Sequence, residues 1–354
     1  MRGIYLAIVL CTAASAADLA VGSAKATEGQ RATGFIDVPA GTDAGSRIPV
    51  IVINGAKAGP TLALVAGSHG TEYASIVAMA QLARLIDPAQ LSGALIIVPL
   101  VNPASFLEKV PHLNPVDQKN MNRFYPGKPE GTITERASWA IGQQVVTQCD
   151  YLIDLHGGDL DENLRQYTYW ANTGNERLDA ISKGMVLAFG FDHIVIQRSR
   201  ANTPRPANAT SALSRFAEDN GKPAVTAEAG HAGTANAEDV DALIRGCTNV
   251  MRHLKMLAGT VKPVEHPLWI GRYTVVSSEH DGIFYPLTVP EAYVHKGAKI
   301  GYITNYFGEK LSDVSAPHAG VVLYIASVPS MRKGDNISYI GEIADSSDAV
   351  QAPR

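Results

Sequence analysis

Residues 61–72 read Thr-Leu-Ala-Leu-Val-Ala-Gly-Ser-His-Gly-Thr-Glu, and this stretch decides the fold. The apolar run 61–66 is typical of a strand, whereas residues 74–86 have the apolar spacing of a helix. The glycines between them place His69 and Glu72 at a strand-to-helix turn, pointing outward from the edge of a sheet. Imidazole and carboxylate both suit zinc, and a catalytic zinc has three protein ligands and one open position. For this pair alone, a salt bridge at a helix start is the alternative.

Two further apolar runs end in a similar way. Residues 151–155 lead into His156 and two glycines, and residues 224–227 lead into Glu228, two residues before Gly230. Ligands of open α/β sheets gather outside the carboxyl ends of the strands, so these side chains are expected to meet His69 and Glu72 in one crevice. His156 is the expected third ligand and Glu228 a candidate general base. Taken singly, His156 could be a hydrogen-bonded strand-end residue, and Glu228 an acid that begins a helix.

The segment 117–127 is polar, resembles a loop and ends in Pro-Gly. It contains Asn122 and Arg123, which place an amide beside a guanidinium. Because arginine binds carboxylates through two parallel hydrogen bonds, the two residues are candidates for holding a substrate carboxylate. A surface arginine in a turn is the alternative.

The ordered set of motifs resembles the succinylglutamate desuccinylase/aspartoacylase family, a branch of the zinc carboxypeptidase-like hydrolases. The motifs are His69-Gly-Thr-Glu72, Asn102-Pro103, Asn122-Arg123, Asp154-Leu-His156-Gly-Gly and Glu228-Ala-Gly, and the likeness covers roughly residues 45–345. The resemblance implies an α/β fold with a zinc carboxypeptidase-like mixed sheet flanked by helices. It also implies amide hydrolysis, one Zn²⁺ per chain held by His69, Glu72 and His156, Glu228 as base, and Asn122 and Arg123 on the substrate carboxylate.

The chain departs from the family pattern at one point. Relatives usually carry an arginine several residues before the Asn-Arg pair, where it helps to polarise the scissile carbonyl, but no arginine lies between Pro103 and Asn122. Lys109, His112 and Lys119 are candidates to replace it, as are the cations of the segment 197–205.

The expected chemistry follows from the residue types. Zinc polarises a carbonyl oxygen and lowers the pKa of a water molecule, which addresses both difficulties of amide hydrolysis. Glu228 would take the proton of that water and deliver a proton to the departing amine. Asp154 lies two residues before His156, and alternate strand residues share a face, so its carboxylate could support the imidazole ring. A polar role at the strand end is the alternative for Asp154.

The first 16 residues have the pattern of a secretory signal peptide. Met1-Arg2 precedes an apolar run too short for a permanent membrane anchor, and Ala14-Ser15-Ala16 fits a cleavage site. We therefore expect an exported, periplasmic protein that starts near Ala17 and has no stable membrane anchor. Export permits a disulfide between Cys149 and Cys247, but the sequence leaves open whether they pair.

The formal net charge of −4 over 354 residues shows no basic surface for nucleic acid. A small-molecule or short-peptide partner fits this charge better, and the oligomeric state stays open. Two domains are predicted after the signal peptide, a zinc-hydrolase α/β domain at 27–262 and a β-rich domain at 266–346. The β-rich domain resembles a barrel-sandwich module but lacks the lysine motif of lipoyl or biotinyl carriers. The family resemblance implies that it is a structural lid or shapes the substrate site. Tyr306 either reaches the cleft or packs a hairpin.

The leading functional interpretation is an exported zinc amidohydrolase that cleaves the amide of an N-acyl amino acid or a similar small carboxylate. One alternative is a periplasmic metallocarboxypeptidase that acts on short peptides or muropeptides, since the same metal chemistry serves both reactions. The other is a non-catalytic zinc-containing binding protein. The identity of the acyl group and of the amino acid cannot be read from the sequence.

Overall fold

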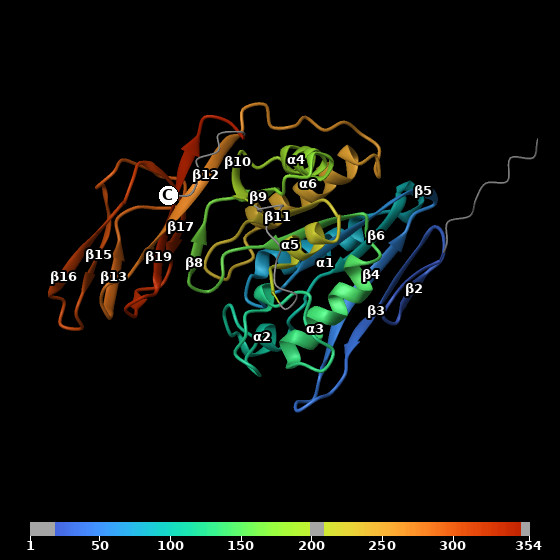
Figure 1. Cartoon of the computed structure of the whole chain (residues 1–354), viewed down its shortest axis with the longest axis horizontal. Coiled ribbons are helices and arrows are strands. Elements are labelled where there is room, and N and C mark those ends of the chain that lie inside the picture. Colours follow the sequence, from blue (N-terminus) through green and yellow to red (C-terminus); the bar gives the residue numbers. More distant parts are fainter. Residues whose placement is uncertain (1–17, 199–208, 348–354) are drawn as a thin grey trace, which may run out of the picture.

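The computed structural model describes residues 18–198 and 209–347. Within them, one mixed sheet of 13 strands runs through the molecule (Figure 1). Its order is β14-β17-β19-β12-β10-β9-β11-β7-β5-β6-β4-β3, with β8 paired to β17. The strands before residue 260 are β3 (Gln30–Val38), β4 (Ser46–Asn54), β5 (Lys57–Ala66), β6 (Ser92–Val98), β7 (Tyr151–His156), β8 (Glu162–Leu164), β9 (Tyr167–Asn172), β10 (His193–Arg198) and β11 (Ala224–Glu228). A separate short hairpin pairs β1 (Leu19–Val21) with β2 (Ala24–Ala26).

Strands β6, β5, β7 and β11 run parallel to one another at the centre, whereas β9 is antiparallel to β11. The helices are α1 (Tyr73–Leu85), α2 (Pro103–Glu108), α3 (Ile133–Ile141), α4 (Glu176–Phe189), α5 (Leu213–Asp219) and α6 (Ala237–His253), with short turns η1 (Pro88–Gln90), η2 (Met121–Arg123) and η3 (Gly142–Val146). Among the described residues, none of the helices combines the length and apolar character needed to cross a bilayer.

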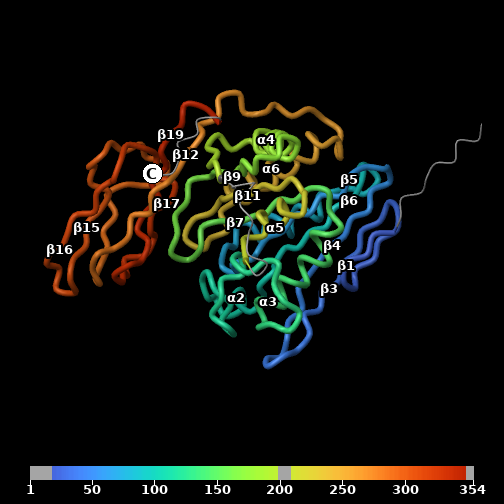
Figure 2. Tube along the Cα trace, viewed as in Figure 1, coloured from blue at the N-terminus to red at the C-terminus, as the bar shows by residue number. Residues whose placement is uncertain are grey.

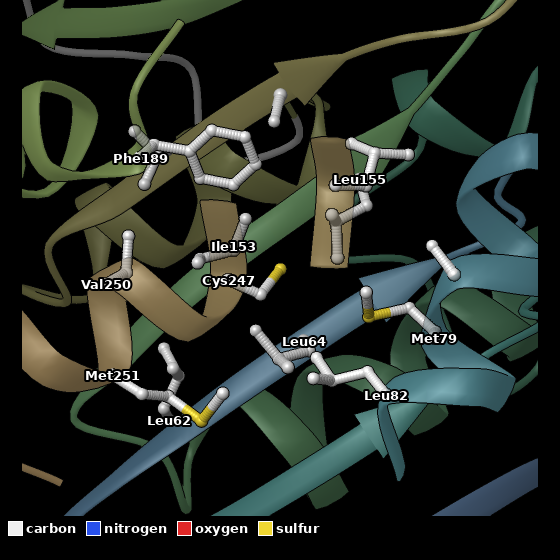
Figure 3. Close-up of a cluster of buried hydrophobic side chains, with 14 of the residues drawn as sticks. Leu62, Leu64, Met79, Leu82, Ile153, Leu155, Phe189, Cys247, Val250 and Met251 are labelled. Carbon is white, nitrogen blue, oxygen red and sulfur yellow. The ribbon is translucent and has the colours of Figure 1, made fainter. Parts of the chain in front are cut away.

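Alternate residues of the central strands pack against two different layers, because successive side chains of a strand point to opposite faces. Leu62 and Leu64 face α1, α4 and α6 in the core that Figure 3 shows. Ala63 and Val65 face α3, α5 and the N-terminal hairpin. A parallel sheet covered on both faces explains why these strands are continuous apolar runs in the sequence.

The two cysteines belong to these two opposite layers. Cys247 is part of α6 and lies in the core on that face of the sheet, and Cys149 follows η3 and lies in the other core. Both are buried and free, so the disulfide that the sequence left open is not formed.

Between residues 268 and 347, every helix or strand that the structure describes is a strand. These are β12 (Leu268–Ser277), β13 (Gly282–Pro286), β14 (Tyr293–Val294), β15 (Lys299–Thr304), β16 (Lys310–Ser315), β17 (Gly320–Ala326), β18 (Ser330–Met331) and β19 (Asn336–Ala344). A four-stranded sheet, β16-β15-β13-β18, packs its apolar face on β17 and β19. This sandwich and the helix-flanked mixed sheet confirm the predicted fold class.

The C-terminal sandwich is continuous with the main sheet, because β12 pairs in parallel with β10 and antiparallel with β19. Figure 2 shows it at the opposite end of the molecule from the N-terminal strands. The segment between α6 and β12 holds no helix or strand, and the boundaries 27–262 and 266–346 stay a prediction. The predicted signal peptide lies outside the described residues.

Candidate zinc and active site

Three adjacent strands bring the predicted site residues together. Ala66 at the end of β5 pairs with Leu155 of β7, and His156 of β7 pairs with Glu228 of β11. Gly67 then turns the chain away from β5 with φ +70°, a left-handed conformation that favours glycine. Glu72 occupies the position before α1, so the turn 67–72 presents His69 and Glu72 beside His156.

The carboxylate of Glu72 lies between the two imidazole rings. Its Oε1 is 2.7 Å from His69 Nδ1, and its Oε2 is 2.8 Å from His156 Nδ1. One ligand atom from each of the three residues lies within 4.8 Å of the others, and all three residues are buried. Two imidazoles and one carboxylate in this arrangement are a donor set that zinc accepts.

The outer ring nitrogens also face oxygen atoms. His69 Nε2 is 3.1 Å from Asn120 Oδ1, and His156 Nε2 is 3.2 Å from Asp154 Oδ1. Asp154 Oδ1 is buried and has no hydrogen-bond donor among the described residues. A metal on Nδ1 of His156 would leave the ring proton on Nε2, where Asp154 can accept it, so the residues present fit a zinc ion.

The two histidines favour the ionised form of Glu72, which is the form that binds a metal. Burial alone would raise the pKa of Glu72, but the positive charges and hydrogen bonds of His69 and His156 lower it to about 2. Glu72 therefore stays anionic over the physiological range.

Glu228 faces the cavity at the end of β11. Burial raises the pKa of its carboxyl well above the ordinary value, and the negative charges of Glu72 and Glu162 add to this effect against the opposing charge of His156. Its side chain makes no hydrogen bond within the part of the chain that the structure describes. A carboxyl whose pKa is raised is suited to exchanging protons near neutral pH.

Asn122 and Arg123 have different surroundings. Asn122 is 6% exposed, and its Nδ2 donates to Asp154 Oδ2 at 3.3 Å and lies 2.9 Å from His156 Nε2. Its Oδ1 accepts a hydrogen bond from the backbone of Leu213 at 2.8 Å. The amide is thus occupied by Asp154 and by the backbone of Leu213. Arg123 is exposed to the cavity, and its only described hydrogen bond goes to a backbone oxygen, so its guanidinium can receive a carboxylate.

These residues line one cavity of about 560 Å³, and the C-terminal strands form part of its wall. Tyr167 and Tyr169 of β9 line it with Glu162 of β8, and Tyr324 and Tyr339 contribute from β17 and β19. The sequence interpretation missed these lining residues, although the alternation of tyrosines at 167 and 169 was a signal for one face of a strand. Tyr306 does not line the cavity and is 74% exposed, so neither predicted role for it is correct.

The candidates to replace the missing arginine differ in whether they line the cavity. Lys109 ends α2 in a left-handed conformation and lies outside the cavity lining. Lys119 pairs with Glu135 at 3.1 Å, also outside it. His112 lines the cavity. Gln197 also lines it but carries no charge, and the side chain of Arg198 and residues 199–205 lie outside the part of the chain that the structure describes. Burial would lower the pKa of His112, but its hydrogen bond to Asp161 and the charges of Asp159, Glu162 and Asp161 raise it to about 10.

The fold and the site define a zinc-dependent hydrolase of amide bonds. The model of the succinylglutamate desuccinylase/aspartoacylase catalytic domain matches residues 58–254, and the chain belongs to this family. It is a zinc-dependent deacylase, in agreement with the activity expected from the sequence.

Three relatives illustrate the likeness. The chain is 26% identical over 326 residues to the N-alpha-acetyl-L-2,4-diaminobutyric acid deacetylase of Halomonas elongata, covering 88% of this chain and 92% of that protein. A product-bound ectoine utilization protein from Ruegeria pomeroyi matches with a TM-score of 0.78 and 26% identity, over 88% of this chain and 95% of that one. A succinylglutamate desuccinylase/aspartoacylase from Rhodobacter sphaeroides has the same fold, with a TM-score of 0.78, 24% identity and coverage of 89% and 96%.

Proposed function

We propose that this protein hydrolyses the amide bond of a small N-acyl amino acid, using one zinc ion held by His69, Glu72 and His156. One observation carries the proposal. The triad, the carboxyl of Glu228 and the guanidinium of Arg123 all face the same cavity, and within residues 18–198 and 209–347 the carboxyl has no hydrogen bond and the guanidinium no ion pair. A cavity of about 560 Å³ is of the size that small-molecule sites have.

Each residue has a distinct part in the reaction. Arg123 holds the carboxylate of the amino acid through two parallel hydrogen bonds and so orients the amide. A zinc ion in the triad would supply Lewis acidity to the carbonyl oxygen and to the attacking water. Glu228 accepts a proton from that water and delivers it to the nitrogen of the departing amine. Asp154 keeps the ring of His156 in place, and Asn122 donates to the other oxygen of Asp154.

The relatives suggest which amino acid to test first. The Halomonas elongata relative is named for the deacetylation of N-alpha-acetyl-L-2,4-diaminobutyric acid, whose side chain carries an amine. The carboxylates of Asp161, Glu162 and Asp335 line the cavity together with Arg123. This lining favours a substrate with one carboxylate and one amine over a substrate with two carboxylates.

The test is a substrate panel on the purified protein with its zinc content measured in parallel. The panel contains N-alpha-acetyl-L-2,4-diaminobutyrate, N-acetyl-L-aspartate, N-succinyl-L-glutamate, a dipeptide and a short muropeptide. Release of a free amino acid from an N-acyl substrate supports the proposal, and cleavage of the peptides alone supports the carboxypeptidase alternative. A zinc-loaded protein that turns over none of them would support the binding-protein alternative.

The variant Glu228→Gln separates chemistry from metal binding. It should keep zinc and lose about 100-fold or more of the rate, which is the typical contribution of a general acid or base. Glu218→Gln makes the same change on α5, outside the cavity lining, and should leave the rate unchanged. Full activity of Glu228→Gln would remove this residue from the mechanism.

We also propose that the protein acts in the periplasm. The proposal rests on the signal-peptide pattern of residues 1–16. The supporting result is a periplasmic protein whose N-terminal residue is Ala17, and an unprocessed protein in the cytoplasm would contradict it.

A further inference from the structure

The three residues of the triad come from two separate segments of the chain. His69 and Glu72 lie in the turn after β5, whereas His156 ends β7. Before the triad, the two segments are joined by sheet pairing, since Ala66 of β5 lies beside Leu155 of β7. Beyond that pair both chains leave the sheet, so other contacts must fix the distance between them.

A buried hydrogen bond joins the same two segments again after the triad. The hydroxyl of Thr71, directly before Glu72, donates to Oδ1 of Asp159, three residues after His156. Thr71 and Asp159 are both 0% exposed. Along the chain, the sheet pair therefore precedes His69 and His156, and this hydrogen bond follows them.

Asp159 is itself held by contacts on both carboxylate oxygens and on its backbone. Oδ1 also accepts from the backbone of Leu160 at 2.7 Å, and Oδ2 accepts from the backbone of His112 at 2.9 Å. The backbone N–H of Asp159 donates to Glu162 Oε2 at 3.2 Å, and its C=O accepts from the backbone of Glu162 at 3.0 Å. Asp159 is therefore a fixed acceptor for Thr71.

The burial of Asp159 argues for a role in placing other groups. Within residues 18–198 and 209–347 it pairs with no lysine or arginine, and the ring nitrogen beside it is Nδ1 of His112 at 3.3 Å. Burying a carboxylate is costly, and apolar residues of similar volume often give equal or greater stability. Placement of neighbouring segments accounts for an aspartate at this position better than a contribution to stability does.

The turn after β5 has a second set of contacts, on the side of α2. Asn102 and Ser105 each form a hydrogen bond of 2.9 Å with its backbone, but α2 carries no zinc ligand. Among the residues that the structure describes, the bond from Thr71 to Asp159 is the one hydrogen bond between this turn and residues 156–162 that involves no zinc ligand. It is thus the contact that can set the spacing of the ligands before a metal binds.

We propose that Asp159, through the hydroxyl of Thr71, is a positioning residue for the zinc site, because it sets the distance between the turn that carries His69 and Glu72 and the end of β7 that carries His156. This inference rests on the zinc site of the proposed function and extends it to two residues that do not line the cavity. A metal site needs its ligands placed in advance, and loss of an outer support typically lowers metal affinity by about 10- to 100-fold.

The test measures the zinc dissociation constants of Thr71→Val and Thr71→Ser by competition with a chromophoric chelator. Valine has the shape of threonine without the hydroxyl, and Asp159 keeps its charge, so Thr71→Val removes only the hydrogen bond between the two segments. Its zinc affinity should fall about tenfold, at the lower end of the usual range for an outer support. Thr71→Ser keeps the hydroxyl and should bind zinc nearly as tightly as the wild-type protein.

Thr173→Val is the matched control. The hydroxyl of Thr173 also donates to an aspartate, Asp179, and neither residue lines the cavity. The control should lower the melting temperature of the zinc-free protein, as Thr71→Val does, and leave the zinc dissociation constant unchanged. A loss of zinc affinity in Thr71→Val alone separates positioning of the ligands from a general loss of stability.

Hydrogen exchange on the wild-type protein gives a second measurement, which does not require any variant to fold. The backbone amides of Leu160 and His112 both donate to Asp159, so zinc loading should slow their exchange together. The backbone amides of Thr173 and Gly174 donate to the control aspartate at 2.9 Å each, and their exchange should not respond to zinc.

A folded Thr71→Val with the zinc affinity of the wild-type protein would overturn the inference. So would a Thr71→Ser that binds zinc as weakly as Thr71→Val, or exchange at Leu160 and His112 that does not respond to zinc. If the wild-type protein binds no zinc, the proposed zinc site fails and this inference fails with it. If it binds zinc but hydrolyses nothing in the panel, the proposed function alone fails, so the two failures are distinguishable.

Discussion

The variant Asp154→Asn should weaken zinc binding without unfolding the protein. Asp154 is fully buried, with Oδ1 3.2 Å from His156 Nε2 and Oδ2 accepting from Asn122 Nδ2 at 3.3 Å. An asparagine has the same shape but only one oxygen, so it can accept from His156 or from Asn122 and presents an NH₂ group to the other. One of two buried donors then loses its acceptor.

The expected loss of zinc affinity follows from the loss of the hydrogen-bond acceptor of His156. Removing the hydrogen-bond partner of a metal-ligating histidine typically costs 10- to 100-fold in metal affinity. At about 1.4 kcal/mol per factor of ten, this corresponds to about 1.4 to 2.8 kcal/mol of binding free energy. The charge of a carboxylate close to the cation is lost as well, which acts in the same direction.

The assay is competition for zinc between the protein and a chromophoric chelator at fixed pH and ionic strength. The matched control is Asp239→Asn, which removes a buried carboxylate 2.7 Å from His231 Nδ1 and outside the cavity lining. The control should lower the free energy of unfolding and leave the zinc dissociation constant unchanged. If Asp154→Asn binds zinc as tightly as the wild-type protein, Asp154 does not support His156 in the loaded site.

Two further expectations concern Arg123 and the cysteines. Arg123→Lys keeps the charge but loses the planar pair of donors, so KM for the N-acyl amino acid should rise about tenfold, which corresponds to one lost charge-assisted hydrogen bond of about 1.5 kcal/mol. KM should change far less for the analogue in which a carboxamide replaces the carboxylate of the amino acid. Equal effects on both substrates would show that Arg123 does not bind the carboxylate. Burial raises the pKa of the Cys149 thiol to about 12 and that of the Cys247 thiol further, so neither should be alkylated in the native protein at mildly alkaline pH, and both should be after unfolding. Peptide mapping by mass spectrometry checks this, and rapid native labelling of Cys247 would contradict the placement of α6.

The site could be predicted from the sequence because its parts are local. Each of His69, His156 and Glu228 comes at or just after the end of an apolar run and close to a glycine, and His69 and Glu72 share one turn. A strand followed by a sharp turn is readable from composition and spacing, and parallel strands present their carboxyl ends on one edge. The helix α1 could be located for the same reason, since the apolar spacing of residues 74–86 is continuous.

The partners of the ligands could not be predicted, because they depend on packing between distant segments. Asn122 was interpreted as a substrate contact, but its amide donates to Asp154 and accepts from the backbone of α5, two contacts that only the tertiary structure brings together. The separation of Cys149 and Cys247 has the same origin. Whether two buried cysteines can pair depends on which face of the sheet each one covers, and the sequence of the intervening elements does not contain the strand order.

The strand order also explains why the C-terminal strands belong to the catalytic unit. The family model ends at residue 254, yet Tyr324 and Tyr339 line the cavity from β17 and β19. Tyr324 of β17 pairs with Leu164 of β8, and Glu162 of the same short strand faces the cavity together with Glu228. The strand β8 has β17 as its neighbour in the sheet, so the conformation of the segment that carries Glu162 depends on the C-terminal sandwich. The metal ligands of this cavity thus come from the α/β part of the chain, and part of its wall comes from the C-terminal strands. Both parts therefore determine the size of the acyl amino acid that the cavity accepts.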